Sequence, residues 1–481
     1  MNRVKYYRAH IIRGKAAKEL ENLLPAYTSV IEDVTPSEEE NFATLFKNSM
    51  RKILERYTPS VTDKTLDNHR TEIAGKWFAL YYSENGVMKI SERARKFAQD
   101  EDSAQFFKDL CYKSQFPNAT VKKSTYVEWK EKGLSIRYYC YLTRFLQLAE
   151  TKNIYLDYRQ IGYYVLNNEY ALTRKYSPDE ILEQVVYDDR HGGIREVCVP
   201  KGENASYYHQ HLREMCNLFV LSGIVEMDED GIIRLNRAEE AAIKLFASHW
   251  NDRPLYKAED YDFSKQEQCT LYERAWQKYF AEPSSEFAFF KSAIIIPDMM
   301  KDDELPGKPE EKSDTQKKVR NSAGKIGELG EYIVYQLERQ RVSLNPRFKN
   351  DVRRIKNLGA STGYGYDIVS VAANIECERP LEPKDSIYIE VKTTRRVLPP
   401  DKKDCVPFKF TRNEYNAARQ HKDHFFIYKV VLFGHGGCRV YRIQNPVDNS
   451  KVEFEAQNYD VYVDTSDFEY SEYSKEKVDE L

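Results

Sequence analysis

The sequence of 481 residues lacks the features of a membrane or secreted protein. No apolar run approaches the roughly 20 residues that a membrane-spanning helix needs. The first residues also lack the apolar core of a signal peptide. We therefore expect a cytoplasmic protein with no membrane partner. Because the chain is too long for one ordinary core, we expect roughly two to four domains.

Cysteine is scarce and scattered. Eight cysteines occur, and none of them forms a Cys-x-x-Cys pair or a Cys/His spacing suited to zinc. Reduced structural thiols are the simplest interpretation of this pattern. The sequence therefore predicts no structural zinc site.

An excess of charge of one sign is also missing, because 73 lysines and arginines balance 76 aspartates and glutamates. Such a chain has no overall field that attracts nucleic acid, so any DNA binding must come from local basic surfaces. No Gly-x-x-x-x-Gly-Lys-[Ser/Thr] motif occurs either. Dependence on ATP would therefore require a second protein.

Four segments in the last third of the chain carry the chemical signal. The last of them, Phe410–Glu414, contains Thr411-x-x-Glu414, a capping box that opens a helix. Gly324–Glu331 opens an amphipathic helix, because apolar residues recur three or four positions apart. Gly363–Ile368 and Ile389–Lys392 are expected to be strands, the first ending at an aspartate. In the second strand, period-2 geometry places Glu390 and Lys392 side by side on one face.

Asp367, Glu390 and Lys392 together suit metal-dependent chemistry. The two carboxylates are oxygen ligands for a hard divalent cation such as Mg²⁺, and Mn²⁺ accepts the same ligands. The metal would polarise a phosphoryl oxygen and lower the pKa of a bound water. Lys392 would orient that water or offset charge in the transition state. This set predicts hydrolysis of phosphodiesters.

A competing interpretation of each motif stays open. A Glu-x-Lys triplet is most commonly alternating charge on a solvent-facing strand. The nuclease interpretation is favoured because Asp-Ile follows a Gly-Tyr turn about twenty residues earlier and a Gly-Glu helix precedes both. Glu328 or Glu331 could supply a further acid, or could simply favour the positive end of the helix dipole. Glu331 flanks the apolar stripe, so we select it over Glu328.

Asp367, Glu390 and Lys392 resemble the signature of the PD-(D/E)XK nucleases. The order of the Gly-Glu helix, Gly-Tyr-Asp-Ile, Ile-Glu-Val-Lys and Phe-x-x-Thr-x-x-Glu, closed by the strand Phe425–Val431, is similar to the NO VEIN C-terminal branch of that superfamily. The residue before Asp367 is Tyr366 and not proline, which is ordinary for that branch. The resemblance implies a mixed α/β restriction-endonuclease-like core. It also implies these site residues: catalytic Asp367, Glu390, Lys392 and Glu331, with Asp367, Glu390 and Val391 as metal ligands.

The N-terminal half repeats one order of elements. The first copy is a hairpin with an Asn-Gly turn, Trp77–Tyr82 and Val87–Ile90, followed by a helix that Ser91 caps. The second copy is a helix at Asn204–Ser222, a hairpin that turns at Gly231 and a helix capped by Asn236. Helix, hairpin and helix is the order of a winged helix, so we expect two winged-helix-like units.

The helix Asn204–Ser222 is the candidate for reading DNA, because polar and aromatic side chains lie outside its apolar stripe. An ordinary surface helix or a protein-docking winged helix would have the same pattern. The order of elements in this half also resembles the recognition halves of some type II restriction endonucleases. The expected DNA-binding residues are Tyr207, Gln210, Arg213, Asn217, Lys89 and Arg234.

The sequence thus predicts an α+β multidomain protein with a helical, winged-helix N-terminal half and a C-terminal mixed α/β core. The expected boundaries are 1–165 and 166–300 for the recognition units, 301–323 for a linker, 324–466 for the nuclease domain and 467–481 for a charged tail. The linker lacks apolar periodicity and concentrates charge, Pro and Gly.

The expected function is Mg²⁺-dependent cleavage of double-stranded DNA in type II restriction or another antiphage defence. One alternative is a nuclease effector that a partner ATPase or sensor licenses, and a second is a non-catalytic DNA-binding protein. A homodimer and a partner methyltransferase stay open.

Overall fold

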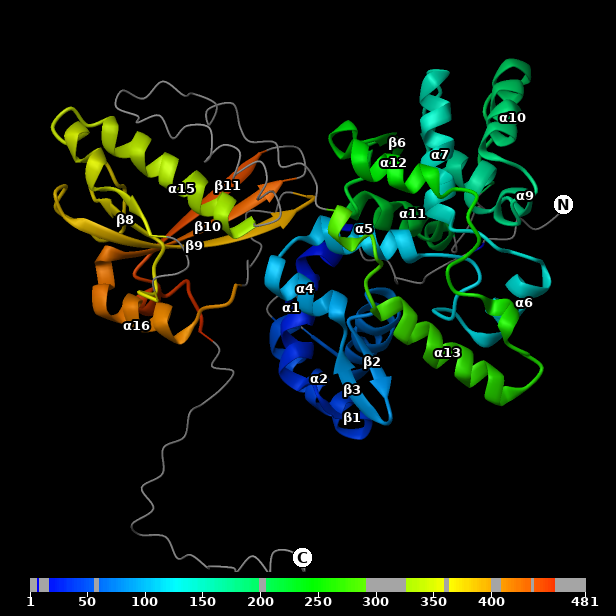
Figure 1. The fold of residues 1–481 in the computed structure, drawn as a ribbon, viewed down its shortest axis with the longest axis horizontal. Coiled ribbons are helices and arrows are strands. Elements are labelled where there is room, and N and C mark those ends of the chain that lie inside the picture. Colours follow the sequence, from blue (N-terminus) through cyan, green and yellow to red (C-terminus); the bar gives the residue numbers. More distant parts are fainter. Residues whose placement is uncertain are drawn as a thin grey trace, which may run out of the picture.

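The computed structural model describes two bodies that lie side by side, a mostly helical N-terminal region and a C-terminal domain built on one sheet (Figure 1). The expected linker and charged tail lie outside the described residues, as do the side chains of residues 205–211 and 288–289. The described residues are 7, 17–55, 60–198, 205–290, 326–358, 363–398, 408–433 and 437–454.

The C-terminal domain contains a five-stranded sheet in the order β11-β10-β9-β8-β7. The central strand β9 (Ser386–Arg396) pairs in parallel with β10 (Phe425–Phe433) and antiparallel with β8 (Ile368–Val371). The outer strands β11 (Cys438–Gln444) and β7 (Lys356–Asn357) are antiparallel to their neighbours. The sheet is therefore mixed, as expected, and β9 is its centre.

One helix covers each face of this sheet (Figure 1). Helix α15 (Ile326–Ser343) packs on the face that carries Ile389 and Val391. Helix α16 (Arg412–His421) packs on the opposite face, in a smaller cluster that includes Tyr388. Because side chains alternate along a strand, Glu390 and Lys392 share the α16 face with Tyr388.

Gly330 explains why the Gly-Glu helix needs its glycine. A Cβ atom at this position would lie 1.7 Å from Oγ1 of Thr393 on β9, which is far inside van der Waals contact. Helix α15 can therefore cross β9 closely only with glycine at this point. This close approach brings the next residue, Glu331, toward β9, the strand that carries Glu390 and Lys392.

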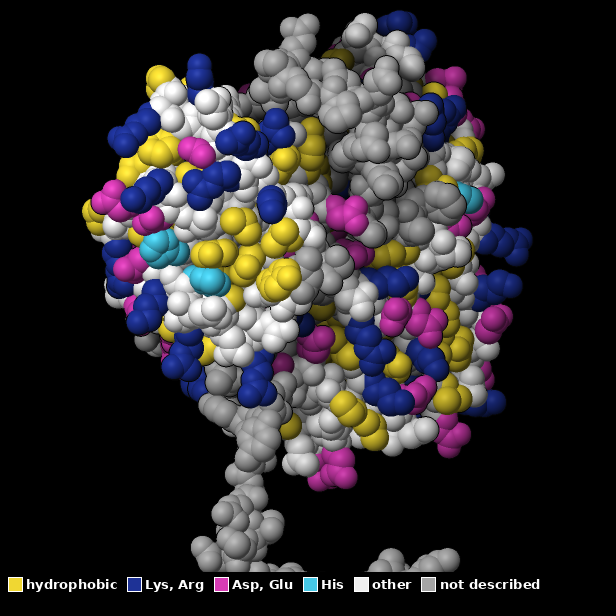
Figure 2. Space-filling model, turned by 60° about the vertical axis from the view of Figure 1, so that its left-hand side comes forward, with side chains coloured by type: hydrophobic (Ala, Val, Ile, Leu, Met, Phe, Trp, Pro, Cys, Tyr) yellow, Lys and Arg dark blue, Asp and Glu magenta, His cyan; other side chains and the backbone are white. Residues whose placement is uncertain are grey.

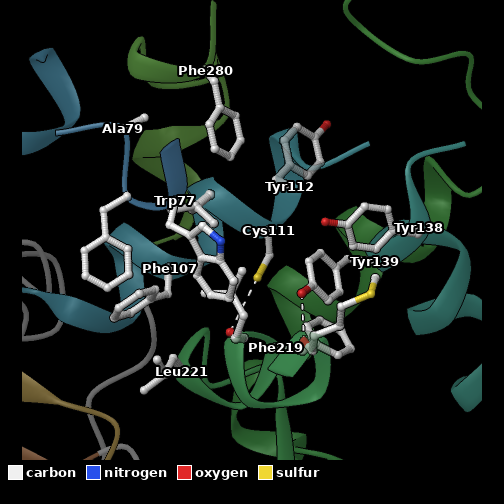
Figure 3. Packing of buried hydrophobic residues seen from close by; sticks show 14 of the residues in the cluster. Trp77, Ala79, Phe107, Cys111, Tyr112, Tyr138, Tyr139, Phe219, Leu221 and Phe280 are labelled. Carbon is white, nitrogen blue, oxygen red and sulfur yellow. Dashed lines mark hydrogen bonds between the residues drawn. The ribbon is translucent and has the colours of Figure 1, made fainter. Parts of the chain in front are cut away.

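The N-terminal region has one continuous buried cluster that extends from Tyr7 to Phe290. Its centre is aromatic, with Trp77, Phe107 and Tyr139 among the labelled side chains of Figure 3. The hydroxyl of Tyr139 donates a hydrogen bond of 2.7 Å to the carbonyl oxygen of Met215. The expected division at residue 165 stays a prediction, although this cluster spans it.

Most helices described in this region are α-helices. The others are two π-helical segments, His69–Trp77 and Gly162–Leu166, and three short 3-10 helices, Arg237–Glu239, Ala258–Asp260 and Phe287–Phe290. The α-helices are α1 (Ala17–Val34), α2 (Glu39–Glu55), α3 (Asp63–Asn68), α4 (Glu92–Asp100), α5 (Ser103–Lys113), α6 (Lys123–Glu131), α7 (Tyr138–Thr151), α8 (Tyr158–Ile161), α9 (Glu169–Leu172), α10 (Pro178–His191), α11 (Ala205–Leu221), α12 (Glu240–Ser248) and α13 (Gln266–Ala281).

Two three-stranded sheets sit among these helices, and both have the same construction. Each joins a hairpin to a short strand from earlier in the chain. The turns match as well, because Gly86 has φ +80° and Gly231 has φ +83°. The sheets are β1 (Ser37–Glu38), β3 (Val87–Ile90) and β2 (Tyr81–Glu84), and β4 (Leu156–Asp157), β6 (Ile232–Leu235) and β5 (Val225–Met227).

Two expected strands were wrong in part. The first hairpin begins at Tyr81, because Trp77 ends a π-helical segment and is only 1% exposed in the helical core. Asp367 precedes β8 and does not end a strand. The residues before it form a turn, in which Gly363 has φ +64° and Gly365 has φ +79°. A left-handed backbone of this kind is incompatible with a strand.

The far end of β9 joins the two bodies. The backbone N–H of Arg395 donates to the carbonyl oxygen of Glu101 at 3.0 Å. The carboxylate of Glu21 accepts from the backbone N–H groups of Val397 at 2.6 Å and Leu398 at 3.0 Å. The strand that carries Glu390 and Lys392 is therefore anchored in the N-terminal region.

Two general expectations can be compared with the described residues. None of the described helices is long and apolar enough to span a membrane. The seven cysteines that the structure describes are free thiols, in agreement with the expected reduced state.

Candidate active site

Asp367 is held rigidly at the start of β8. Its backbone N–H donates to the carbonyl oxygen of Ile389 at 2.9 Å. Its Oδ2 atom accepts from the backbone N–H of Val391 at 2.8 Å. Burial raises the pKa of Asp367, although the Val391 bond and the Lys392 charge oppose the increase. The carboxylate is thus fixed beside the middle of β9.

Glu390 lies in the middle of β9 and is only 5% exposed. Its side chain forms a hydrogen bond with Asp367 and an ion pair of 2.8 Å with Nζ of Lys392. Burial raises the pKa of Glu390 to about 8, with further contributions from the negative charges of Asp367 and Glu414, while Lys392 opposes the increase. The site therefore concentrates more carboxylates than one lysine can neutralise.

Lys392 is held between two carboxylates. Its Nζ atom lies 2.8 Å from Oε1 of Glu390 and 2.7 Å from Oε2 of Glu414. Burial alone would lower the pKa of Lys392, but the charges and hydrogen bonds of the two glutamates raise it. The ammonium therefore stays charged near neutral pH and has a fixed position.

Glu414 was not among the expected site residues. The sequence pattern predicted it only as the third residue of a capping box, and this role is confirmed, because Thr411 accepts from the N–H of Glu414 and the Glu414 side chain accepts from the N–H of Thr411. The same carboxylate also contacts Lys392. The Phe-x-x-Thr-x-x-Glu element of the family pattern was the signal that could have identified it.

Glu331 lies near the same cluster from the other helix. Burial raises the pKa of Glu331 to about 7, and the charges of Asp367 and Glu328 add to the increase. Glu328 is exposed, as its angle on the helix predicted. The structure therefore places Glu331, and not Glu328, within electrostatic reach of Asp367.

The donor set is compatible with a divalent cation. Asp367 and Glu390 supply hard oxygen ligands, and the negative charge of Asp367 contributes to the raised pKa of Glu390, as expected for two close carboxylates. Within the described ranges, no three His, Cys, Asp or Glu side chains converge on one point. Val391 lies between Glu390 and Lys392, with its N–H already bound to Asp367.

The expected DNA-binding residues do not form one cluster that the structure describes. The side chains of Tyr207 and Gln210 lie outside the described residues. Arg213 is exposed on α11 and lies 5.6 Å from the centre of the Tyr158 ring. The remaining positions lie on different elements: Asn217 is half-buried on α11, Lys89 pairs with Glu84 at 2.7 Å on the first hairpin, and Arg234 pairs with Asp228 at 3.6 Å on the second.

The sheet with its cluster of Asp367, Glu390, Lys392 and Glu414 forms a C-terminal domain beside a separate N-terminal region, and each part matches a known family. Residues 330–443 match the family model described as Protein NO VEIN, C-terminal. Residues 2–277, more than half of the chain, match the model described as Restriction endonuclease BpuJI, N terminal. The chain belongs to this restriction endonuclease family.

A solved structure extends this similarity. The chain is 36% identical to a structure described as pyrene- and phenanthrene-modified DNA in complex with the BpuJ1 endonuclease binding domain, with a TM-score of 0.54. The match covers 58% of this chain and 98% of that one. No curated protein matches the chain.

Proposed function

We propose that this protein is a Mg²⁺-dependent DNA endonuclease of the type II restriction class, in which the N-terminal region recognises DNA and the C-terminal domain cuts it. The observation that carries the proposal is the position of Lys392, 2.8 Å from Glu390 and 2.7 Å from Glu414. Asp367, held by the N–H of Val391, completes the cluster from the turn that precedes β8.

Each residue has a defined task in this mechanism. Asp367, Glu390 and Val391 would hold the cation, which would polarise the phosphoryl oxygen and favour ionisation of a water when bound. Lys392 positions that water or offsets the charge that develops on the phosphate. Glu331, whose pKa is raised to about 7, can gain or lose a proton near neutral pH. It therefore suits an auxiliary acid.

The N-terminal region suits DNA recognition through two winged-helix-like units. Both units consist of helices followed by a hairpin with a matching glycine turn. The similarity to a DNA-binding domain supports this assignment. Double-stranded DNA is therefore the proposed partner, and a homodimer and a methyltransferase partner are compatible with a restriction role.

The test is cleavage of phage and plasmid DNAs by the purified full chain in Mg²⁺, followed by mapping of the ends. Lys392→Met keeps the side-chain length and removes the charge, so we expect most activity to be lost while metal binding is retained. The control is Lys451→Met, because this lysine is 78% exposed and pairs only with a surface glutamate in the described part of the chain.

Two outcomes would overturn the proposal. The first is full cleavage by Lys392→Met, and the second is undiminished cleavage by the wild type in excess EDTA. Absence of any cleavage by the wild type, combined with metal and DNA binding, would favour the effector that a partner ATPase or sensor licenses.

A further inference from the structure

Four aromatic rings form a ladder beside the catalytic cluster. Tyr364 stacks on Tyr366 with ring centres 5.9 Å apart and 17° between the planes. Tyr366 contacts Tyr388 at 5.0 Å, and Tyr388 stacks on His421 at 3.7 Å and 27°. We call Tyr364, Tyr366, Tyr388 and His421 the aromatic ladder. It joins a loop, a strand and a helix of one domain.

Tyr364, at one end of the aromatic ladder, lies away from the hydrophobic core. Tyr364 is 61% exposed, so its ring contributes little to the burial that stabilises the fold. Gly363 and Gly365 flank it with left-handed backbones. A Cβ atom on Gly365 would lie 2.4 Å from the carbonyl oxygen of Asn413, so the turn docks tightly on the start of α16. The chain therefore fixes an exposed tyrosine at a defined place.

The ladder is continuous with the catalytic residues. Tyr366 directly precedes Asp367 in the sequence. Tyr388 lies two residues before Glu390 on the same face of β9, which is about 7 Å along the strand. His421 ends α16, the helix whose first turn supplies Glu414. A nucleotide next to the phosphate at Glu390 would therefore lie beside these rings.

Polar and charged groups surround His421, the ring at the other end of the aromatic ladder from Tyr364. A hollow of about 590 Å³ lies beside His421, and its lining combines Gln420 and Lys422 with the carboxylates of Glu382, Asp385 and Asp423. Arg412, Arg419 and Lys422 are exposed on α16 and the turn after it. Figure 2 shows hydrophobic and histidine side chains gathered on this domain, with lysines and arginines around them. This surface combines flat rings with cations, as sites for single-stranded nucleic acid do.

We propose that the aromatic ladder is a stacking site for an unpaired base of the DNA strand that is cut, with Tyr364 as the outer platform. The proposal rests on the proposed nuclease function and adds a substrate feature to it. The base would stack on the Tyr364 ring, while the adjacent phosphate reaches Asp367 and Glu390. A fully paired base would keep its ring inside the duplex and could not occupy this site.

The test measures binding of a fluorescein-labelled oligo(dT) by the full chain in EDTA, where no cleavage occurs. Stacking on one ring corresponds to a change in Kd between about five-fold and about one-hundred-fold, so Tyr364→Ala should weaken binding within this range. Tyr364→Phe keeps the ring and should bind within about two-fold of the wild type. The same oligonucleotide carrying 5-iodouracil should crosslink to Tyr364 on irradiation.

The matched control is Tyr187→Ala. Tyr187 is 59% exposed and stacks on His191 at 4.1 Å, but it lies on α10 of the N-terminal region. An unchanged Kd for Tyr364→Ala, with crosslinks only to other residues, would overturn the proposal that a base stacks on Tyr364. This holds even if Mg²⁺-dependent cleavage is intact. Weaker binding by Tyr364→Ala in a protein that cuts no DNA would support the stacking site and reject the self-sufficient endonuclease of the proposed function.

Discussion

Two buried clusters of charge, one in each body of this protein, are built in different ways. In the N-terminal region, Arg93 and Asp109 are both fully buried and pair at 2.7 Å. Each charge of this pair has a partner of opposite sign, so the pair is electrically neutral without a ligand. In the C-terminal domain, Lys392 pairs with both Glu390 and Glu414, and burial raises the pKa of Glu390 and of the neighbouring Asp367. An excess of buried negative charge is costly for the fold and is the arrangement expected at a candidate functional site.

The largest expected effect comes from removing one buried carboxylate from each body. Asp109→Ala leaves the Arg93 guanidinium buried without its charge partner and should lower the free energy of unfolding by roughly 3 to 5 kcal/mol. Glu390→Ala instead removes a group that repels its neighbours, so metal-free stability should be unchanged or higher. Cleavage should fall by roughly a thousand-fold or more, because a metal ligand is lost.

Urea unfolding in EDTA and cleavage in Mg²⁺ measure these two quantities on the same variants. The comparison fails if Glu390→Ala unfolds as easily as Asp109→Ala, because its carboxylate would then be part of the structural core. It also fails if Glu390→Ala cuts DNA at the wild-type rate.

A smaller effect should separate recognition from chemistry. Base-edge contacts discriminate by roughly 1 to 3 kcal/mol each, whereas phosphate contacts act on all sequences alike. Gln210→Ala combined with Arg213→Ala should therefore relax the choice of DNA sequence and leave the catalytic cluster intact. Selection from a randomised DNA pool measures this preference for the wild type and the double variant. The matched control is Arg190→Ala, which removes an exposed arginine of α10 that is not among the expected DNA-binding residues.

An unchanged preference in the double variant would transfer recognition to the first unit, around Lys89 and its hairpin. A wild type without any sequence preference would favour the licensed effector over a type II restriction enzyme.

Local patterns predicted most of the elements that position the site. Apolar spacing predicted α11 and α15, and alternation predicted that Glu390 and Lys392 share one face of β9. These signals succeed because one short segment contains all the information. The strand expected at Trp77 was wrong because the aromatic residues of that segment are buried within a helical core, which overrides their preference for strands.

Contacts between distant segments could not be predicted from one sequence. Glu414 follows Lys392 by 22 positions, and only the folding of α16 onto the sheet brings them to 2.7 Å. The contact of Glu21 with Val397 joins residues that are 376 positions apart. The docking of β9 onto the N-terminal region therefore became visible only in the structure. It shows that β9, the strand that carries Glu390 and Lys392, belongs to the C-terminal sheet and also bonds to the N-terminal region.

The smallest expected effect is the pH dependence of stability. The pKa of Glu390 is raised from 4.5 to about 8 in the folded protein, so between these values the folded state binds more protons than the unfolded state. Stability of the metal-free wild type should then decrease as pH rises from about 5 to about 8. Glu390→Gln does not titrate and should lack this contribution. Its Tm in EDTA should exceed that of the wild type by roughly 2 to 4 °C at pH 8, and by less at pH 5.

Mg²⁺ should reverse the order of the two Tm values at pH 8, so that the wild type unfolds at a higher temperature than Glu390→Gln. A cation that binds Asp367 and Glu390 needs both carboxylates ionised, so it competes with protons for them. It should therefore stabilise the wild type most at high pH. Thermal unfolding at pH 5 and pH 8, with EDTA or with Mg²⁺, measures the four combinations for both proteins. Glu331→Gln is the matched variant, because the pKa of Glu331 is also raised but its side chain is the auxiliary acid in the proposed site. The difference in Tm between the wild type and Glu390→Gln could instead be the same at both pH values, with and without Mg²⁺. In that case Glu390 would be a structural charge, like Asp109 in the N-terminal region, and the contrast between the two bodies would be wrong.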